Sequence, residues 1–217
     1  MTHLKRNSAP VRWPIPRKGS AFVIKSGEKE IPLLVALRDV LKVARTRKEV
    51  KAAIHQKNIL ICGKPAKDEK QKLMLFDNLT LVPVKKSYSL GLSEKGKFVF
   101  SEISEKDISK KTSKIVDKKI LKGKKIQLNL NDGRNILADC KCKVNDSVIL
   151  DLEKKKVLKV LELKDGANAL VMEGKHIGEK GKINKIQSEM KMAELEIEGK
   201  KFNALIKQLM VLEWKIM

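Results

Sequence analysis

The pattern of apolar and polar residues changes along the chain, and the first 31 residues show little periodicity. Prolines stand at positions 10, 14 and 16, and Pro32 lies at the edge of this segment. Because proline removes a backbone donor and blocks helix formation, we expect residues 1–32 to form an extended arm. A frayed tail is the alternative.

From Leu33 the apolar positions follow a helical period. One stripe recurs at i, i+4, i+7 and i+11, at Leu33, Leu37, Val40 and Ala44. It predicts an amphipathic helix. The box "TRKE" at 46–49 predicts the start of a second helix, because a Thr hydroxyl and a Glu carboxylate can satisfy its first backbone N–H groups. We expect that helix to end at Asn58.

Beyond residue 58 the pattern is that of short strands. "ILIC" at 59–62 predicts a buried strand turned by Gly63-Lys64, and "LMLF" and "LTLVPV" predict strands on either side of a turn. Residues 85–165 are strand-rich, and Asp132-Gly133 predicts a hairpin because Asp-Gly readily adopts positive φ. There "SEKDISKKTSKIV", starting at Ser104, predicts one helix. The last segment alternates as in a small barrel.

The net charge of the chain indicates which type of partner it binds. The 217 residues carry a formal net charge of +22, which is typical of proteins that bind a polyanion, nucleic acid before an anionic membrane surface. Residues 1–48 hold twelve Lys and Arg against three acids, and six of the seven arginines lie there, Arg134 being the exception. Since the planar fork of arginine suits phosphate, we expect the binding surface in this region.

Other chemistry finds little support in the sequence. Three cysteines make no disulfide framework and favour a reducing compartment. Cys140-x-Cys142 lacks the second ligand pair of a zinc site and fits one face of a strand. No apolar run approaches the roughly 20 residues that span a bilayer. Neither a nucleotide-binding glycine pattern nor a catalytic triad is present, so we predict no cofactor, no metal and no enzymatic activity.

Two segments resemble known RNA-linked modules. Residues 33 to about 82 resemble the S4-type RNA-binding domain, whose pattern is met by Leu37-Arg38, Leu41, Ala44, Thr46-Arg47, Glu49-Val50, Ile54, Ile59, Ile61 and Gly63-Lys64. The segment "GKHIGEKGKI" resembles a KOW motif, a glycine-containing loop of small SH3-like barrels.

The order of the parts resembles the archaeal and eukaryotic type of small-subunit ribosomal protein four, "S-four-e". The matching pieces are His3-Leu4-Lys5-Arg6, Ala9-Pro10, Trp13, Asp132-Gly133-Arg134 and Gly174, Ile177-Gly178 and Gly181. The chain departs from the family pattern at "KSGEKEIP", "KLMLFD" and "KFNALIKQLMVLEW". The resemblance implies an α+β, mostly β fold with a basic arm (1–32), a small two-helix S4-type domain (33–84), a β-rich central domain (85–165) and a KOW or SH3-like barrel (166–217).

The resemblance also implies a function. A structural constituent of the small ribosomal subunit would bind small-subunit rRNA through phosphate and shape contacts, beside neighbouring ribosomal proteins in the cytoplasm. It implies no membrane, no small-molecule substrate and no obligate homo-oligomer. An RNA-modifying enzyme with an S4-type targeting domain and a non-ribosomal basic RNA-binding protein are the alternatives.

The residues themselves predict a phosphate cradle. Packed apolar stripes would hold the basic faces of the two helices side by side, near a helix N-terminus; lysines that only face water are the alternative. Trp13 could stack on a base or anchor the arm. The residues expected to bind RNA are Lys5, Arg6, Arg12, Trp13, Arg17, Lys18, Arg38, Lys42, Arg45, Thr46, Arg47, Lys48, Lys51, Lys57, Lys64, Arg134, Lys175, His176, Lys180 and Lys182.

Overall fold

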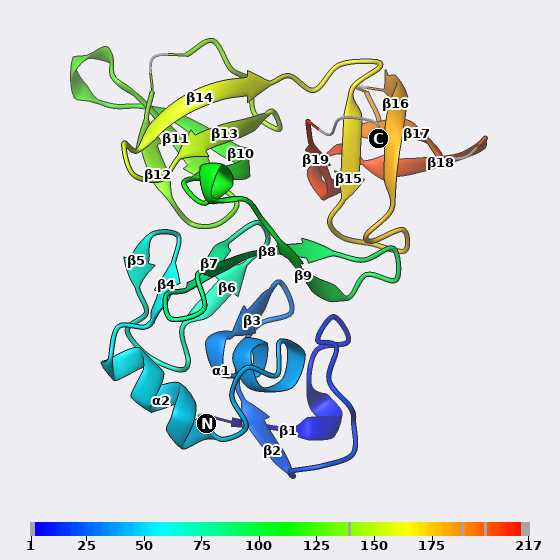
Figure 1. The fold of residues 1–217 in the computed structure, drawn as a ribbon. Coiled ribbons are helices and arrows are strands. Elements are labelled where there is room, and N and C mark those ends of the chain that lie inside the picture. The colour runs from blue at the N-terminus through cyan, green and yellow to red at the C-terminus, as the bar shows by residue number, and fades with distance from the viewer. Residues whose placement is uncertain (1–2, 139, 188, 198, 214–217) are drawn as a thin grey trace. The chain divides into compact units, whose positions relative to one another are not determined.

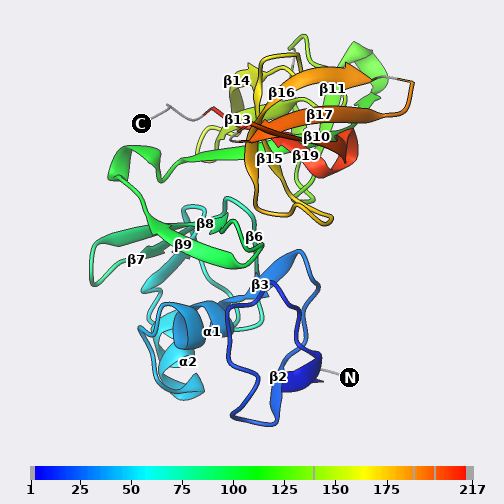
Figure 2. The same ribbon diagram turned by 90° about the vertical axis from the view of Figure 1, so that its right-hand side faces the viewer.

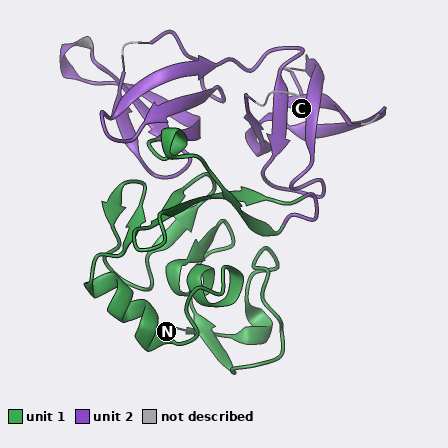
Figure 3. Ribbon diagram, viewed as in Figure 1, with its two compact units in different colours: residues 1–93, 97–109 green, residues 94–96, 110–217 purple. Residues whose placement is uncertain are grey.

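The computed structural model describes residues 3–138, 140–187, 189–197 and 199–213. The fold is mostly β with two short helical segments, as the sequence predicts (Figure 1). The chain divides into two compact units. Unit 1 comprises residues 1–93 and 97–109, and unit 2 comprises residues 94–96 and 110–217 (Figure 3).

The first residues of unit 1 form a closed loop, which corrects the expectation of an extended arm. β1 (His3–Lys5) pairs antiparallel with β2 (Phe22–Ile24) and closes the loop. Inside it, the buried guanidinium of Arg6 donates from Nε to the carbonyl of Ser20 at 2.7 Å and from Nη1 to that of Pro16 at 3.1 Å. Proline-rich sequence is compatible with both shapes, and these tertiary hydrogen bonds favour the loop.

Trp13 anchors this loop to the rest of unit 1. Its side chain is 2% exposed, and the indole Nε1 donates to the carbonyl of Glu30 at 2.9 Å. One residue earlier, the carbonyl of Arg12 accepts from the backbone N–H of Phe98 at 2.9 Å. The anchoring role is therefore the one that the structure describes for Trp13, and its buried ring has no open face for a base.

The first helix is shorter than its apolar stripe. α1 (Leu33–Val35) continues into a π-helical turn, η2 (Ala36–Val40). The backbone of Lys42 then takes a positive φ of 54°. A left-handed residue cannot continue a right-handed helix, so the predicted stripe ends before Ala44.

The second helix confirms the predicted capping box. α2 (Arg47–His55) follows Thr46, whose Oγ1 accepts from the N–H of Glu49 at 3.3 Å. The Glu49 carboxylate in turn accepts from the N–H of Arg45 at 2.8 Å. Val50 and Ile54 are buried, so the opposite face of α2 is turned outward. α1 and α2 lie next to each other on one side of the sheet of unit 1 in both ribbon views (Figures 1 and 2).

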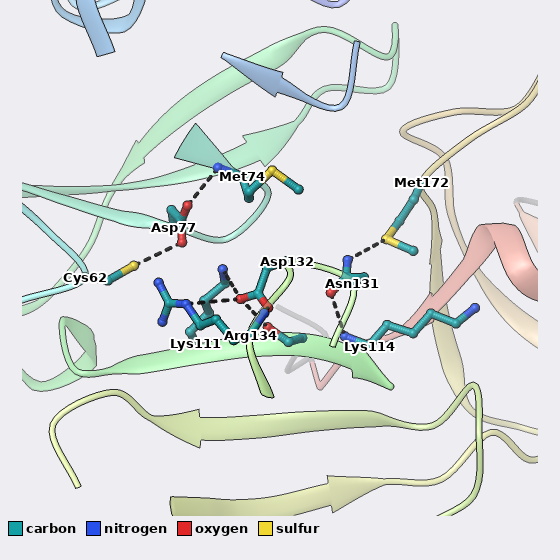
Figure 4. A network of polar contacts seen from close by, with 10 residues as sticks. Cys62, Met74, Asp77, Lys111, Lys114, Asn131, Asp132, Arg134 and Met172 are labelled. Carbon is teal, nitrogen blue, oxygen red and sulfur yellow. Dashed lines mark hydrogen bonds and ion pairs between the residues drawn. The ribbon is translucent and has the colours of Figure 1, made fainter. Parts of the chain in front are cut away.

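That sheet has the strand order β5-β4-β7-β8-β9. Its members are β4 (Ile59–Ile61), β5 (Lys64–Pro65), β7 (Asn78–Leu81), β8 (Lys86–Leu92) and β9 (Phe98–Glu102). The predicted turn between β4 and β5 is confirmed, with positive φ at Cys62 and Gly63. β6 (Lys72–Met74) pairs with β3 (Glu30–Pro32), so the two strands predicted around Asp77 form no hairpin. There the Asp77 carboxylate accepts from the N–H of Met74 and from the Cys62 thiol (Figure 4).

Unit 2 contains two five-stranded antiparallel sheets. The first has the order β12-β11-β10-β13-β14. Its strands are β10 (Lys110–Ile120), β11 (Ile126–Leu130), β12 (Asn135–Leu137), β13 (Ser147–Asp151) and β14 (Lys156–Leu161). The Asp132-Gly133 turn between β11 and β12 is confirmed, with φ of 78° at Gly133.

The helix predicted from Ser104 is wrong. Only a 3-10 turn covers Glu105–Asp107, and β10 begins at Lys110. β10 pairs with β13 over residues 110–114 and with β11 over residues 115–120. Two flanking strands satisfy its backbone in the extended form, and this tertiary pairing overrides a helical pattern made mostly of lysine and serine.

Cys140 and Cys142 lie in an irregular segment rather than in the predicted strand. Their sulfur atoms are 3.7 Å apart, and neither forms a disulfide. Burial raises the pKa of the Cys142 thiol to about 11, which disfavours the thiolate that metals and electrophiles require. Among the described residues, no group of three His, Cys, Asp or Glu could hold a metal ion.

The second sheet has the order β18-β17-β16-β15-β19. It consists of β15 (Asn168–Val171), β16 (Lys180–Gln187), β17 (Met192–Ile197), β18 (Lys200–Leu205) and β19 (Leu209–Val211). Gly181 of β16 packs so tightly on β17 that a Cβ would lie 2.7 Å from the Glu196 carbonyl oxygen. A larger residue at this position would force the two strands apart.

Lys114 ties the two sheets of unit 2 together. Its side chain leaves β10, is 3% exposed, and donates from Nζ to the carbonyls of Ile206 at 2.6 Å, Lys207 at 3.0 Å and Leu209 at 2.7 Å. Burial lowers the pKa of Lys114 to about 8, against a smaller opposing effect of the Glu173 charge. Three carbonyl oxygens around one ammonium use all its donors.

The buried ammonium predicts a pH dependence that Lys114→Met should remove. Between pH 8 and the unfolded pKa of roughly 10.4, the unfolded chain binds more protons at this site, so the free energy of unfolding rises with pH. Relative to the variant, the wild-type protein should gain about 2 kcal/mol between roughly pH 7 and pH 10. Urea unfolding of both proteins across this range measures the difference. A difference that does not change with pH would contradict the lowered pKa of Lys114.

Candidate nucleic-acid interface

The outer face of α2 carries the densest set of predicted RNA-binding residues. Lys48 and Lys51 project from its first turns and are exposed, while Val50 and Ile54 bury the opposite face. Arg45 and Lys42, also exposed, precede the helix. The side chains of Lys48 and Lys51 form no ion pair within the part of the chain that the structure describes. We name Lys42, Arg45, Lys48 and Lys51 the α2 cation face.

Arg47 has a different role from its neighbours. Its Nε donates to both carboxylate oxygens of Glu69 at 2.8 Å, and Nη2 donates to the same group. The hydrogen bond from Arg47 lowers the pKa of Glu69, whose side chain is almost fully buried. The pair clamps the loop before β6 to the start of α2, so Arg47 has a role in the fold of unit 1. Its side chain is still 56% exposed, but because of this second role we leave it out of the α2 cation face.

The N-terminus of α2 is partly capped by the protein's own groups. Thr46 takes one N–H, and the Glu49 carboxylate lies beside it with a pKa that the Arg45 N–H lowers. An incoming phosphate would meet this carboxylate. One first-turn N–H is therefore capped and a carboxylate lies beside the helix start, so we expect the attraction for a polyanion to come mainly from the lysine and arginine side chains.

The remaining predicted residues of unit 1 are dispersed. The Arg38 guanidinium pairs with Asp39 at 2.8 Å and is half-buried. Lys57 follows α2 with a φ of 57°, and Lys64 opens β5; both are exposed. Lys57 follows the C-terminal end of α2 and Lys64 lies on the sheet, so neither belongs to the α2 cation face as defined above.

A second basic cluster surrounds the closed loop. An open pocket of about 420 Å³ is lined by residues of both loop limbs, including Lys5, Arg6, Arg17, Lys18 and Phe22. Arg17 uses Nη1 to brace the loop, donating to the carbonyl of Ala9 at 2.6 Å. Lys5 and Lys18 are exposed. The sequence predicted the four cations, but it did not indicate that they line a single pocket.

Among the predicted RNA-binding residues of unit 2, Arg134 lies beside an acidic residue of its own turn. Arg134 lies 3.5 Å from the buried Asp132, which also pairs with Lys111 at 2.6 Å (Figure 4). Burial would raise the pKa of Asp132, but the charge of Lys111 and its hydrogen bond outweigh burial, and the pKa is lowered. Arg134 thus supports the β11–β12 turn.

In the glycine-containing loop of unit 2, His176 is the most constrained residue. Its ring stacks on Phe202 with centroids 4.2 Å apart, and Nδ1 lies 3.1 Å from a Glu179 carboxylate oxygen. Lys175, Lys180 and Lys182 are exposed around it. The lysines remain candidates for phosphate contacts, whereas His176 packs against the protein itself.

The sequence analysis did not predict the partners that bind some of the expected RNA-binding cations within the fold. Glu69 stands 22 positions after Arg47 in a loop of mixed charge, where no local pattern indicates its partner. Phe22 was missed as well, although an aromatic residue beside a run of cations could have been noted.

In the described residues no helix is long and apolar enough to cross a membrane.

Comparison with known proteins gives consistent results. Residues 84–157 match the ribosomal family S4e. The chain is 40% identical over 191 residues to small ribosomal subunit protein eS4 of Methanocella arvoryzae, covering 85% of this chain and 81% of that protein. It is 39% identical over 186 residues to the protein of that name from Archaeoglobus fulgidus, covering 83% and 78%.

Among solved structures, the fold is similar to the crystal structure of the 30S ribosomal protein S4e from Thermoplasma acidophilum. The TM-score is 0.73 at 22% sequence identity, over 86% of this chain and 96% of that one. At this identity the likeness concerns the fold alone.

Proposed function

The chain belongs to the ribosomal S4e family, and from this premise we propose that it is a structural constituent of the small ribosomal subunit that binds small-subunit rRNA. Its partners are that rRNA and neighbouring ribosomal proteins, and its place is the ribosome in the cytoplasm. The role is architectural and non-enzymatic. Binding uses phosphate and shape contacts, because the exposed donors are mainly lysine ammonium groups, which act as point charges.

The α2 cation face is the observation that supports this proposal most strongly. Lys48 and Lys51 are exposed on a helix whose opposite side is buried through Val50 and Ile54. A rigid helix fixes the backbone positions of the two lysines, so little backbone freedom has to be lost when a phosphate backbone binds. Each contact releases counterions from the RNA, which makes the affinity depend steeply on salt.

The modular organisation of the chain supports the same function. We assign residues 33–84 to an S4-type RNA-binding domain and residues 166–217 to a KOW or SH3-like barrel, with a β-rich region at 85–165 between them. The first strands of that region, β8 and β9, continue the sheet of unit 1. The closed loop of residues 3–24 contributes Lys5 and Lys18. Lys175, Lys180 and Lys182 provide a second contact region in the barrel.

Sedimentation of an extract from the source organism tests the proposal. At low salt the protein should migrate with the small subunit, and high salt should release it because the contacts are electrostatic. A protein that stays in the free pool at low salt, or that follows membranes, would contradict the proposal.

A further inference from the structure

The pocket of the closed loop combines cations with an exposed aromatic ring. Phe22 lines the pocket and is 55% exposed, although phenylalanine is usually buried. It is one of only eight Phe, Tyr and Trp residues in the chain, which contains five Phe, one Tyr and two Trp. A large apolar ring left in solvent beside positive charge suggests a ligand with both a flat face and an anionic group.

The ring of Phe22 is held in place from one side. Its centroid lies 4.7 Å from that of His3, with the two planes at 76°, so that one ring meets the other by its edge. In the ladder of β1 and β2, Lys5 is the cross-strand partner of Phe22. The aromatic surface and an ammonium group are therefore attached to paired strand positions.

The pocket is also lined by Arg6, whose guanidinium is buried. Arg6 donates from Nη2 to the Ser20 hydroxyl at 2.7 Å. Gly19 packs against the same guanidinium, so that a Cβ added at this glycine would lie 3.5 Å from Cζ of Arg6. These contacts fix the limb that carries Lys18 relative to the limb that carries Lys5. The site is thus formed by the fold of the loop before any ligand enters.

We propose that this pocket binds one unpaired nucleotide of an RNA strand, with the phosphate near Lys5 and Lys18 and the base stacked on Phe22. The inference rests on the proposed function and specifies which form of RNA the loop selects. In an A-form duplex each base is stacked between its neighbours and offers no face to a side chain, whereas a base in a loop or bulge does. An exposed aromatic ring gains nothing from a continuous helix and gains a stacking contact from an unpaired base.

The experiment compares the binding of full-length protein to a short oligouridylate and to a blunt RNA duplex with the same number of phosphates. Phe22→Leu keeps an apolar side chain but removes the stacking surface. We expect it to weaken binding to oligouridylate by at least about fivefold and to leave binding to the duplex unchanged. Phe22→Trp, which restores a larger aromatic face, should bind oligouridylate at least as tightly as the wild type.

A control variant and a test of assembly separate the possible outcomes. Ile120→Ala removes an exposed apolar side chain of unit 2, far along the chain, and should affect neither RNA. Equal binding of oligouridylate by the Leu and Trp variants, or an equal loss on both RNAs, would overturn the inference. If that result appears while the Phe22→Leu protein still enters the small subunit, the proposed function stands and only the nucleotide site is rejected.

Discussion

Replacing Lys48 and Lys51 together by glutamate is expected to weaken binding to small-subunit rRNA by about 100-fold at low salt, because two charge-assisted phosphate contacts are each worth roughly 1.5 kcal/mol or more. The two side chains are exposed on the outer face of α2, and neither forms an ion pair with the described residues, although the charge of Lys51 helps to lower the pKa of Glu69. The slope of log K against log salt should fall in magnitude by about two, one for each phosphate that a lysine no longer neutralises. Filter binding across a salt series measures both quantities.

The matched control reverses two exposed lysines of unit 2. Lys154→Glu with Lys156→Glu makes the same change in net charge at the β13–β14 turn, far from α2 along the chain. We expect a loss of only a few-fold, through the long-range field of the protein. Equal losses in the two double variants would mean that total charge, rather than the α2 cation face, determines binding. Arg47 is unsuitable for this test, since its substitution would also break the pair with Glu69.

Trp13→Ala is expected to lower the free energy of unfolding of unit 1 by about 3 to 5 kcal/mol, the range for deleting a large buried aromatic side chain. The indole is 2% exposed and donates to the Glu30 carbonyl, so the variant loses packing and leaves a buried carbonyl without its donor. A domain is typically stable by only about 5 to 15 kcal/mol. The loop of residues 3–31 should therefore open, and trypsin should cleave after Arg12, Arg17 and Lys18.

Val11→Ala is the control for this prediction. Val11 precedes Trp13 by two positions and is 77% exposed, so its truncation should change the unfolding free energy by less than about 0.5 kcal/mol. Chemical denaturation and limited proteolysis measure both variants. If Trp13→Ala behaves like Val11→Ala, the closed loop is not anchored by its tryptophan, and the extended arm of the sequence-based prediction would be the better description.

Features set by neighbouring residues could be predicted from the sequence. The cap of α2 depends on Thr46 and Glu49, three positions apart, and the β11–β12 turn depends on Asp132 and Gly133. In each case the residues that form the hydrogen bonds or adopt the positive φ lie within one turn of the chain. Such local signals survive in many tertiary contexts.

Features set by distant residues could not be predicted. β10 forms because β11 and β13 flank it, although its own sequence resembles a polar helix. The buried position of Lys114 depends on carbonyls more than 90 residues away. Both results come from tertiary pairing, which a single sequence does not reveal through its periodicity.

The same division applies to the candidate interface. Net charge and arginine placement predicted a basic N-terminal region, and the exposed Lys48 and Lys51 agree with a surface available to RNA. The sequence could not separate these lysines from Arg47 and Arg6, because the acidic or carbonyl partners of these two arginines are identified only by the fold. For Arg47 and Arg6 those partners lie at least ten positions away.

The most direct test of the α2 cation face as an rRNA-binding surface is a structure of the assembled small subunit from the source organism, determined with this protein in place. We predict that the ammonium groups of Lys48 and Lys51 lie within hydrogen-bonding distance of rRNA phosphate oxygens, at about 2.7 to 3.2 Å. A particle in which the outer face of α2 points into solvent, away from every nucleotide, would contradict this prediction.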